Sequence, residues 1–277
     1  MNRLIGVMQG RLSEPIKGQI QGFPSESWRE EFPTAARLGL GEIEWLVKSW
    51  ESSENPIWSR KGRQEIKRLS QEHGVSVRHL TADVFMAQPL ANPEGKPNPV
   101  SVDGFKRLAQ ACREAGIDSF MIPFVDSGDF VTLAQKSETA VLLNKLGSSG
   151  EMDGLQVTFE MAEPVPAIQE FLRRLDPVFF GLTYDIGDRT GLGGDCAQEI
   201  VALDSSIAHV HIKDKLVKGP SVPLGMGEAP FPEIFDRLSR IHYKGVFILQ
   251  HARGYDPVED VRSCLKFLDR FLLEVSV

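Results

Sequence analysis

The sequence predicts an α/β protein in which residues 1–277 form a single (β/α)8 barrel. Short apolar runs recur roughly every 25 to 45 residues and alternate with stretches of helical periodicity. No GxGxxG pattern follows the first run, where an open dinucleotide-binding sheet would carry one. Polar residues also stand at the ends of many runs, which is how a barrel builds a site around its C-terminal mouth.

The length and composition fit one domain. A chain of 277 residues with 42% hydrophobic content can bury a full core, and no linker or low-complexity segment interrupts it. Eight apolar runs are the expected strands. In chain order they are 4–8, 42–46, 75–80, 120–125, 155–161, 181–184, 208–212 and 246–249.

Eight helices are expected to follow these strands. Three of them end just before a glycine, which readily adopts the left-handed conformation after a last helical turn. These are 27–38 with Gly39, 60–73 with Gly74, and 101–115 with Gly116. The others are 130–146, 164–175, 195–203, 230–241 and 257–275.

Charge and cysteine usage exclude several classes of protein. The net charge of −7 and the lack of a basic stripe argue against a protein that binds nucleic acid. Cys112, Cys196 and Cys264 are isolated, so we expect reduced thiols and a cytoplasmic location. No stretch has the length of a signal sequence or a membrane span, so no membrane partner is expected. Assembly into a homo-oligomer stays open.

The segment IAHVHIKDK places two histidines on one face of a strand. His209 and His211 alternate with apolar residues, so their side chains point the same way. Three other expected strands carry Glu160, Asp185 and Gln250 near their C-terminal ends. Neighbouring strand ends of a barrel meet at its mouth, so these oxygen and nitrogen donors predict a site for one divalent ion, Mn²⁺, Mg²⁺, Co²⁺ or Zn²⁺.

Several short motifs give the chain a family resemblance along nearly its whole length. They are MQGRL, EIEWL, FEM, YDIGD, HVHIKD, PLGMGEAPF and ILQHARG. With them the sequence resembles the xylose-isomerase-like TIM barrels, a superfamily of sugar and sugar-phosphate isomerases and epimerases. In that family Glu, Asp, His and Glu from the last four strands hold one metal ion, which implies Glu160, Asp185 and His211 here. The fourth position differs, because this chain has Gln250 where many relatives have Glu.

The resemblance implies an isomerase or epimerase of a small sugar, sugar phosphate or related polyol. The metal would stabilise an enediolate, and Glu160 would serve as both ligand and base. Gln250 can ligate through its carbonyl oxygen but does not titrate. A one-base transfer between C1 and C2 survives that change, whereas epimerisation at C3 needs another acid, such as Asp188 or a water molecule. His251 points away from the mouth if Gln250 points into it.

Other residues near the expected mouth are candidates for contact with the carbohydrate. Lys213 should face inward like His211 and serve as a catalytic contact, since a buried lysine needs a partner. His209 lies one layer deeper, where it would orient a neighbour. Asp188 is also a candidate for substrate binding. Four further residues either bind the substrate or have an ordinary structural role, such as packing or supporting a loop. They are Trp45, His79, Arg11 and Arg253.

Two segments near the mouth also carry predictions. We expect the glycine-rich stretch 219–227 to be a mobile flap over the site. In GLGGD, the expected role of Asp195 is to cap the next helix.

Three other functions remain as alternatives. A dehydratase of a keto-polyol would use the same metal and enolate chemistry. A non-catalytic sugar-binding barrel is favoured by the missing second glutamate. A nuclease that repairs abasic DNA shares the barrel, but the acidic charge and the few histidines at the mouth disfavour it.

Overall fold

The computed structural model describes residues 5–275, in which eight parallel strands form a closed barrel. The strand order is β1-β10-β7-β6-β5-β4-β3-β2. The barrel strands are β1 (Ile5–Met8), β2 (Glu42–Leu46), β3 (His79–Thr81), β4 (Ser119–Phe124), β5 (Gln156–Met161), β6 (Phe180–Asp185), β7 (Ile207–Ile212) and β10 (Phe247–Leu249). A separate antiparallel hairpin joins β8 (Asp214–Lys215) to β9 (Ser221–Val222). The predicted fold class is confirmed.

Helices follow the strands along the chain. They are α1 (Glu31–Leu38), α2 (Arg60–His73), α3 (Val84–Ala87), α4 (Pro99–Ala115), α5 (Leu133–Gly147), α6 (Val165–Leu172), α7 (Ile186–Gly191), α8 (Cys196–Leu203), α9 (Phe231–Arg240) and α10 (Pro257–Val275). Gly39 and Gly116 end α1 and α4 with φ of 78° and 80°, as predicted from the sequence. Among residues 5–275, no helix is both long and apolar enough to cross a bilayer.

The contacts divide the chain into two compact units, with boundaries inside β2, α2 and β6 and directly after Val75. The first unit comprises Met1–Glu44, His73–Val75 and Thr183–Val277. The second comprises Trp45–Glu72 and Ser76–Leu182. The organisation of 1–277 as one domain stays a prediction.

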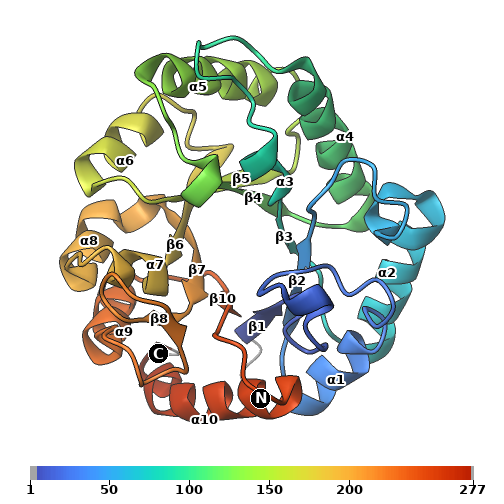
Figure 1. Ribbon diagram of the computed structural model, residues 1–277, viewed down its shortest axis with the longest axis vertical. Helices are drawn as coiled ribbons and strands as arrows, with labels where there is room; N and C mark the ends of the chain where they lie inside the picture. Colours follow the sequence, from blue (N-terminus) through green and yellow to red (C-terminus); the bar gives the residue numbers. More distant parts are fainter. Residues whose placement is uncertain (1–4, 276–277) are drawn as a thin grey trace. The chain divides into compact units, whose positions relative to one another are not determined.

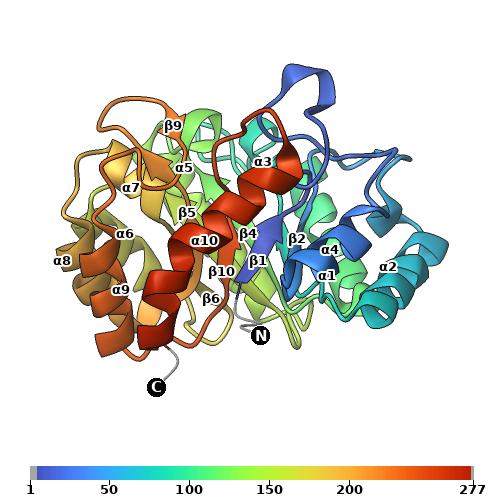
Figure 2. The ribbon, with the colours of Figure 1, turned by 90° about the horizontal axis from the view of Figure 1, so that it is seen from below.

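The core of the first unit forms where two helices cover neighbouring strands. β10 pairs in parallel with β1 on one side and β7 on the other. Figures 1 and 2 show α10 running along the outside of β10 and β1, next to α9. Phe235 of α9 stacks on Phe271 of α10, with ring centroids 5.2 Å apart, and contacts Phe247 of β10 at 5.4 Å. These aromatic rings bury the apolar faces of both helices.

The second unit has an aromatic core between its strands and helices. β4 pairs with β3 and with β5, and Figure 1 shows α4, α5 and α6 on the outside of these strands. Phe105 of α4 contacts Phe120 of β4 at 5.2 Å between ring centroids. Phe159 of β5 contacts Phe124 at 5.3 Å and Phe171 of α6 at 5.5 Å.

The observed elements differ from the predicted ones in a few places. The first strand is confirmed from Ile5 onward, and Leu4 lies outside the described residues. The third strand was predicted at 75–80, whereas β3 is shorter and its ladder with β4 begins at His79. The short helices α3 and α7 and the β8–β9 hairpin were not predicted. Each has too few residues to show a helical or alternating pattern.

Candidate functional site

The centre of the candidate site is His211 on β7, whose imidazole is fully buried. Its Nε2 lies 3.0 Å from Oε2 of Glu44, a buried carboxylate on β2. Burial acts to lower the pKa of His211, but the charge and hydrogen bond of Glu44, with the charge of Asp185, raise it overall. When Nε2 donates to Glu44, the lone pair of neutral His211 is on Nδ1, which is then able to bind a metal ion.

Sequence reasoning missed Glu44. A usable signal was the pair Glu42 and Glu44 in EIEWL, because two acids at alternate positions of an apolar strand must each find a partner when buried.

Asp185 ends β6 and also begins the following helix. Its Oδ1 accepts the backbone N–H of Asp188 at 2.7 Å, which caps α7. Its Oδ2 lies 2.9 Å from Nζ of Lys213 and 3.9 Å from Nδ1 of His211. Burial and the charge of Asp188 raise the pKa of Asp185, while Lys213 and His211 oppose that rise.

Lys213 connects the polar groups of the site, as its predicted inward direction requires. Besides Asp185, its Nζ lies 2.9 Å from Oδ2 of Asp188 and donates to Oε1 of Gln250 at 3.1 Å. Lys215 lies 3.1 Å from the other oxygen of Asp188. Each ammonium group is therefore beside a carboxylate, which offsets the cost of burying the charge.

Glu160 belongs to the second unit, where it is buried near the end of β5. Together with Asp185 and His211 of the first unit, it makes up the three candidate ligands of a metal ion. Two carboxylates and one imidazole, all buried, are a donor set that fits Mn²⁺, Mg²⁺, Co²⁺ or Zn²⁺.

The two predicted loop arginines bind the chain's own backbone. Arg253 donates to the carbonyl oxygens of Gly10 at 2.7 Å, Ser13 at 3.0 Å and Ile20 at 2.7 Å. Nη1 of Arg11 also donates to the carbonyl of Ile20. Burial lowers the pKa of Arg253, against the charges of nearby acids. The geometry therefore favours the structural alternative for both side chains, which hold the loop after β1 in place.

The same loop covers a buried carboxylate that the sequence did not point to. Glu31, in the first turn of α1, accepts the backbone N–H of Gly10 at 2.9 Å and the hydroxyl of Ser13 at 2.9 Å. Burial raises its pKa to about 7, although these hydrogen bonds and the charge of Arg253 act to lower it.

The remaining predicted contacts have different surroundings. Trp45 is buried, and its indole N–H donates to Oδ1 of Asn55 at 3.0 Å, which favours its packing alternative. His79 is partly exposed on β3, and His209 is buried on β7. Their proposed roles stay predictions. Burial and two nearby arginines lower the pKa of His251 to about 3, so this buried imidazole is neutral near pH 7.

The glycine-rich segment 219–227 is fastened to the hairpin by Asp214. The carboxylate accepts backbone N–H groups of Gly225 at 2.8 Å, Gly227 at 2.9 Å and Ala229 at 3.2 Å. These bonds fix one end of the predicted flap. Asp195 caps α8 by accepting the N–H of Gln198 at 3.1 Å, as predicted.

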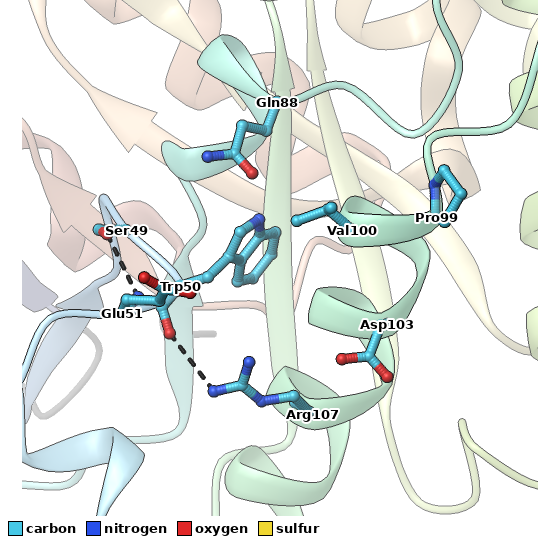
Figure 3. Close-up of a pocket in the computed structure, with 8 residues that line it drawn as sticks. All are labelled: Ser49, Trp50, Glu51, Gln88, Pro99, Val100, Asp103 and Arg107. Atoms are coloured by element: carbon cyan, nitrogen blue, oxygen red, sulfur yellow. Dashed lines mark hydrogen bonds between the residues drawn. The ribbon is translucent and has the colours of Figure 1, made fainter.

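The second unit also has a surface cavity that contains none of the predicted site residues. Its volume is about 530 Å³. Figure 3 shows its lining residues, Ser49, Trp50, Glu51, Gln88, Pro99, Val100, Asp103 and Arg107. Arg107 donates to the carbonyl oxygen of Trp50 at 3.4 Å across one side.

Comparison with known proteins gives consistent results. L-ribulose-5-phosphate 3-epimerase UlaE of Escherichia coli (strain SMS-3-5 / SECEC) is 23% identical over 248 residues, covering 85% of this chain and 87% of that protein. The xylose isomerase domain protein from Planctomyces limnophilus has a similar fold, with a TM-score of 0.75, 17% identity and coverage of 99% and 98%. D-psicose 3-epimerase from Clostridium cellulolyticum H10 also has a similar fold, with a TM-score of 0.73 and 13% sequence identity; the match covers 97% of this chain and 99% of that chain. A match to the family described as xylose isomerase-like TIM barrel covers residues 32–271. Because that match spans most of the sequence, the chain belongs to this family.

Proposed function

We propose that this chain is a divalent-metal-dependent epimerase or isomerase of a small sugar, sugar phosphate or related polyol. The observation that carries the proposal is the pair of buried candidate ligands in the first unit, Oδ2 of Asp185 and Nδ1 of His211, which lie 3.9 Å apart. Glu160 is the proposed third ligand. Relatives named as 3-epimerases of L-ribulose 5-phosphate and D-psicose support a ketose as the substrate class.

The residues of the site have different roles in transferring a proton at the carbon next to a carbonyl group. A bound divalent ion would polarise the carbonyl and stabilise negative charge on its oxygen. In isomerisation, Glu160 takes the proton from one carbon and delivers it to the neighbouring carbon on the same face, so one carboxylate suffices. In epimerisation, Glu160 takes the proton and a second acid, Asp188 or a water molecule, returns one to the same carbon on the opposite face. Lys213, 2.9 Å from Asp185, adds a positive charge that favours the enediolate. Glu44 holds the imidazole of His211 in orientation.

The test combines metal analysis with isotope exchange. Purified wild-type protein is dialysed and its metal content measured, and then ketoses are incubated with it in D₂O and followed by NMR. We expect about one divalent ion per chain and incorporation of deuterium at carbon. Glu160→Gln should abolish the exchange, whereas Glu170→Gln, at an exposed position on α6, should leave it intact. A wild-type protein without stoichiometric divalent metal would refute the metal-dependent function.

The same experiment separates the alternative functions. An epimerase or isomerase leaves the mass of the unlabelled product unchanged, whereas a dehydratase lowers it by one water. Binding of a sugar without any exchange of its α-proton would indicate the non-catalytic barrel. The cytoplasmic location stays a prediction from the sequence, and assembly into a homo-oligomer stays open.

A further inference from the structure

The side chain of Gln250 is held on both sides by polar partners. It follows β10 directly, and its backbone N–H donates to the carbonyl of Ile212 at 3.0 Å, which continues the pairing of β10 with β7. Its Oε1 accepts from Nζ of Lys213 at 3.1 Å, and its Nε2 donates to Oε1 of Gln21 at 3.2 Å. The amide orientation is therefore defined by a donor on one side and an acceptor on the other.

The bond to Lys213 places a full positive charge beside the one oxygen through which Gln250 could bind a metal ion. That ammonium is also within 2.9 Å of Asp185 and Asp188, so three acceptors hold it next to the amide. A divalent ion on the same amide oxygen would face this ammonium at close range, and the two like charges would repel each other. Asp185 lies similarly close to the ammonium, but its negative charge attracts both cations, whereas the neutral amide has no charge to offset their repulsion.

We propose that Gln250 is a substrate contact and not a ligand of the metal ion. The inference rests on the proposed function. The metal is then held by Glu160, Asp185 and His211 alone, which matches the three protein ligands typical of catalytic sites that keep positions open for substrate and water. Gln250 instead binds the substrate by a hydrogen bond from its side-chain amide.

The hydrogen-bonding capacity of the amide defines what it recognises. Nε2 of Gln250 carries two N–H groups, and only the one to Gln21 has an acceptor among the described residues. The remaining N–H is a neutral donor suited to a hydroxyl or carbonyl oxygen of a sugar. Gln21 lies in the loop after β1, so this loop supplies the second amide of the contact.

A neutral residue at this position also preserves the charge arrangement. The ammonium of Lys213 is shared between Asp185 and Asp188, and a carboxylate at position 250 would compete with both for it. Glutamine accepts from Lys213 without adding charge. This explains how a glutamine fits a position where a glutamate would change the ion pairing of the site.

The test measures metal affinity and substrate affinity separately. Mn²⁺ is titrated calorimetrically into metal-depleted wild type, Gln250→Ala, Gln21→Ala and Asp185→Asn, with Gln71→Ala on the exposed face of α2 as the matched control. D-psicose, D-tagatose and L-ribulose 5-phosphate are the kinetic probes. Thermal melting confirms that each variant is folded.

We expect Gln250→Ala and Gln21→Ala to bind Mn²⁺ within about threefold of wild type, and to raise KM about tenfold for the ketose that turns over. Asp185→Asn should weaken Mn²⁺ binding by about a hundredfold. The inference is overturned if Gln250→Ala weakens Mn²⁺ binding tenfold or more, or leaves KM unchanged. If wild type binds no Mn²⁺, the proposed function fails, and the inference fails with it. If the inference alone is wrong, wild type still binds Mn²⁺ and only the results for the Gln250 variant differ from those expected.

Discussion

Replacing Glu31 by Gln tests whether a carboxyl group buried under the loop after β1 makes stability depend on pH. Glu31 is almost completely buried, and its pKa is raised to about 7 from an ordinary 4.5. Between these two values the folded protein keeps a proton on Glu31 that the unfolded chain has lost. The free energy of unfolding therefore falls as pH rises through this window.

The size of the effect follows from the shift. At 1.36 kcal/mol per pKa unit, the displacement from 4.5 to about 7 corresponds to about 3 kcal/mol. This stability is fully present below pH 4.5 and is lost as pH rises through about 7. Between pH 5 and pH 8 the loss amounts to about 2.5 kcal/mol. Glu31→Gln carries a neutral acceptor at every pH, so this contribution to the pH dependence disappears.

Urea denaturation at several pH values from 5 to 8 measures the prediction. The advantage of Glu31→Gln over wild type should grow by about 2.5 kcal/mol across that range. Glu30→Gln removes the neighbouring, exposed carboxylate and serves as the matched control. A difference between wild type and Glu31→Gln that stays constant with pH would refute the assignment of a raised pKa to Glu31.

Three further substitutions test other buried interactions. Glu44→Gln removes the charge that orients the imidazole of the site, so calorimetry should show Mn²⁺ binding about 10- to 100-fold weaker; unchanged binding would contradict that role. Arg253→Met removes one donor from each of three carbonyl groups and should cost about 2–4 kcal/mol, with faster amide exchange in the loop after β1. Arg189→Met leaves the carboxylate of Glu199 buried without its 2.6 Å partner and should cost about 3–5 kcal/mol in urea denaturation, whereas a loss below 1 kcal/mol would contradict it.

The barrel was predictable because its strands are buried on both faces. Such strands appear as short continuous apolar runs, and β2 has the predicted bounds. The third strand was overestimated for the same reason. Val75 and Val77 are buried and apolar, yet β3 begins only at His79. Burial is visible in a sequence, whereas the start of a ladder depends on the neighbouring strand.

The site was predictable where position along a strand determines direction. The strand-end argument selected Asp185, His211 and Lys213, which lie close together in the first unit. The arginines show the limit of this reasoning. A guanidinium after a strand is compatible with an anionic ligand, but the donors of Arg253 go to backbone carbonyls whose positions depend on the loop conformation.

The two oxygens of Asp185 serve different structures. Oδ1 caps α7, and Oδ2 faces the candidate metal site. If the first turn of α7 opens, the carboxylate of Asp185 is no longer held in place. Partial unfolding of α7 therefore also disorders the candidate metal site. Any ligand that binds Oδ2 in the folded state must then suppress this local opening by mass action. The amide protons of Ile186–Gly191 are thus natural reporters of occupancy, since their exchange with solvent should slow in proportion to ligand bound.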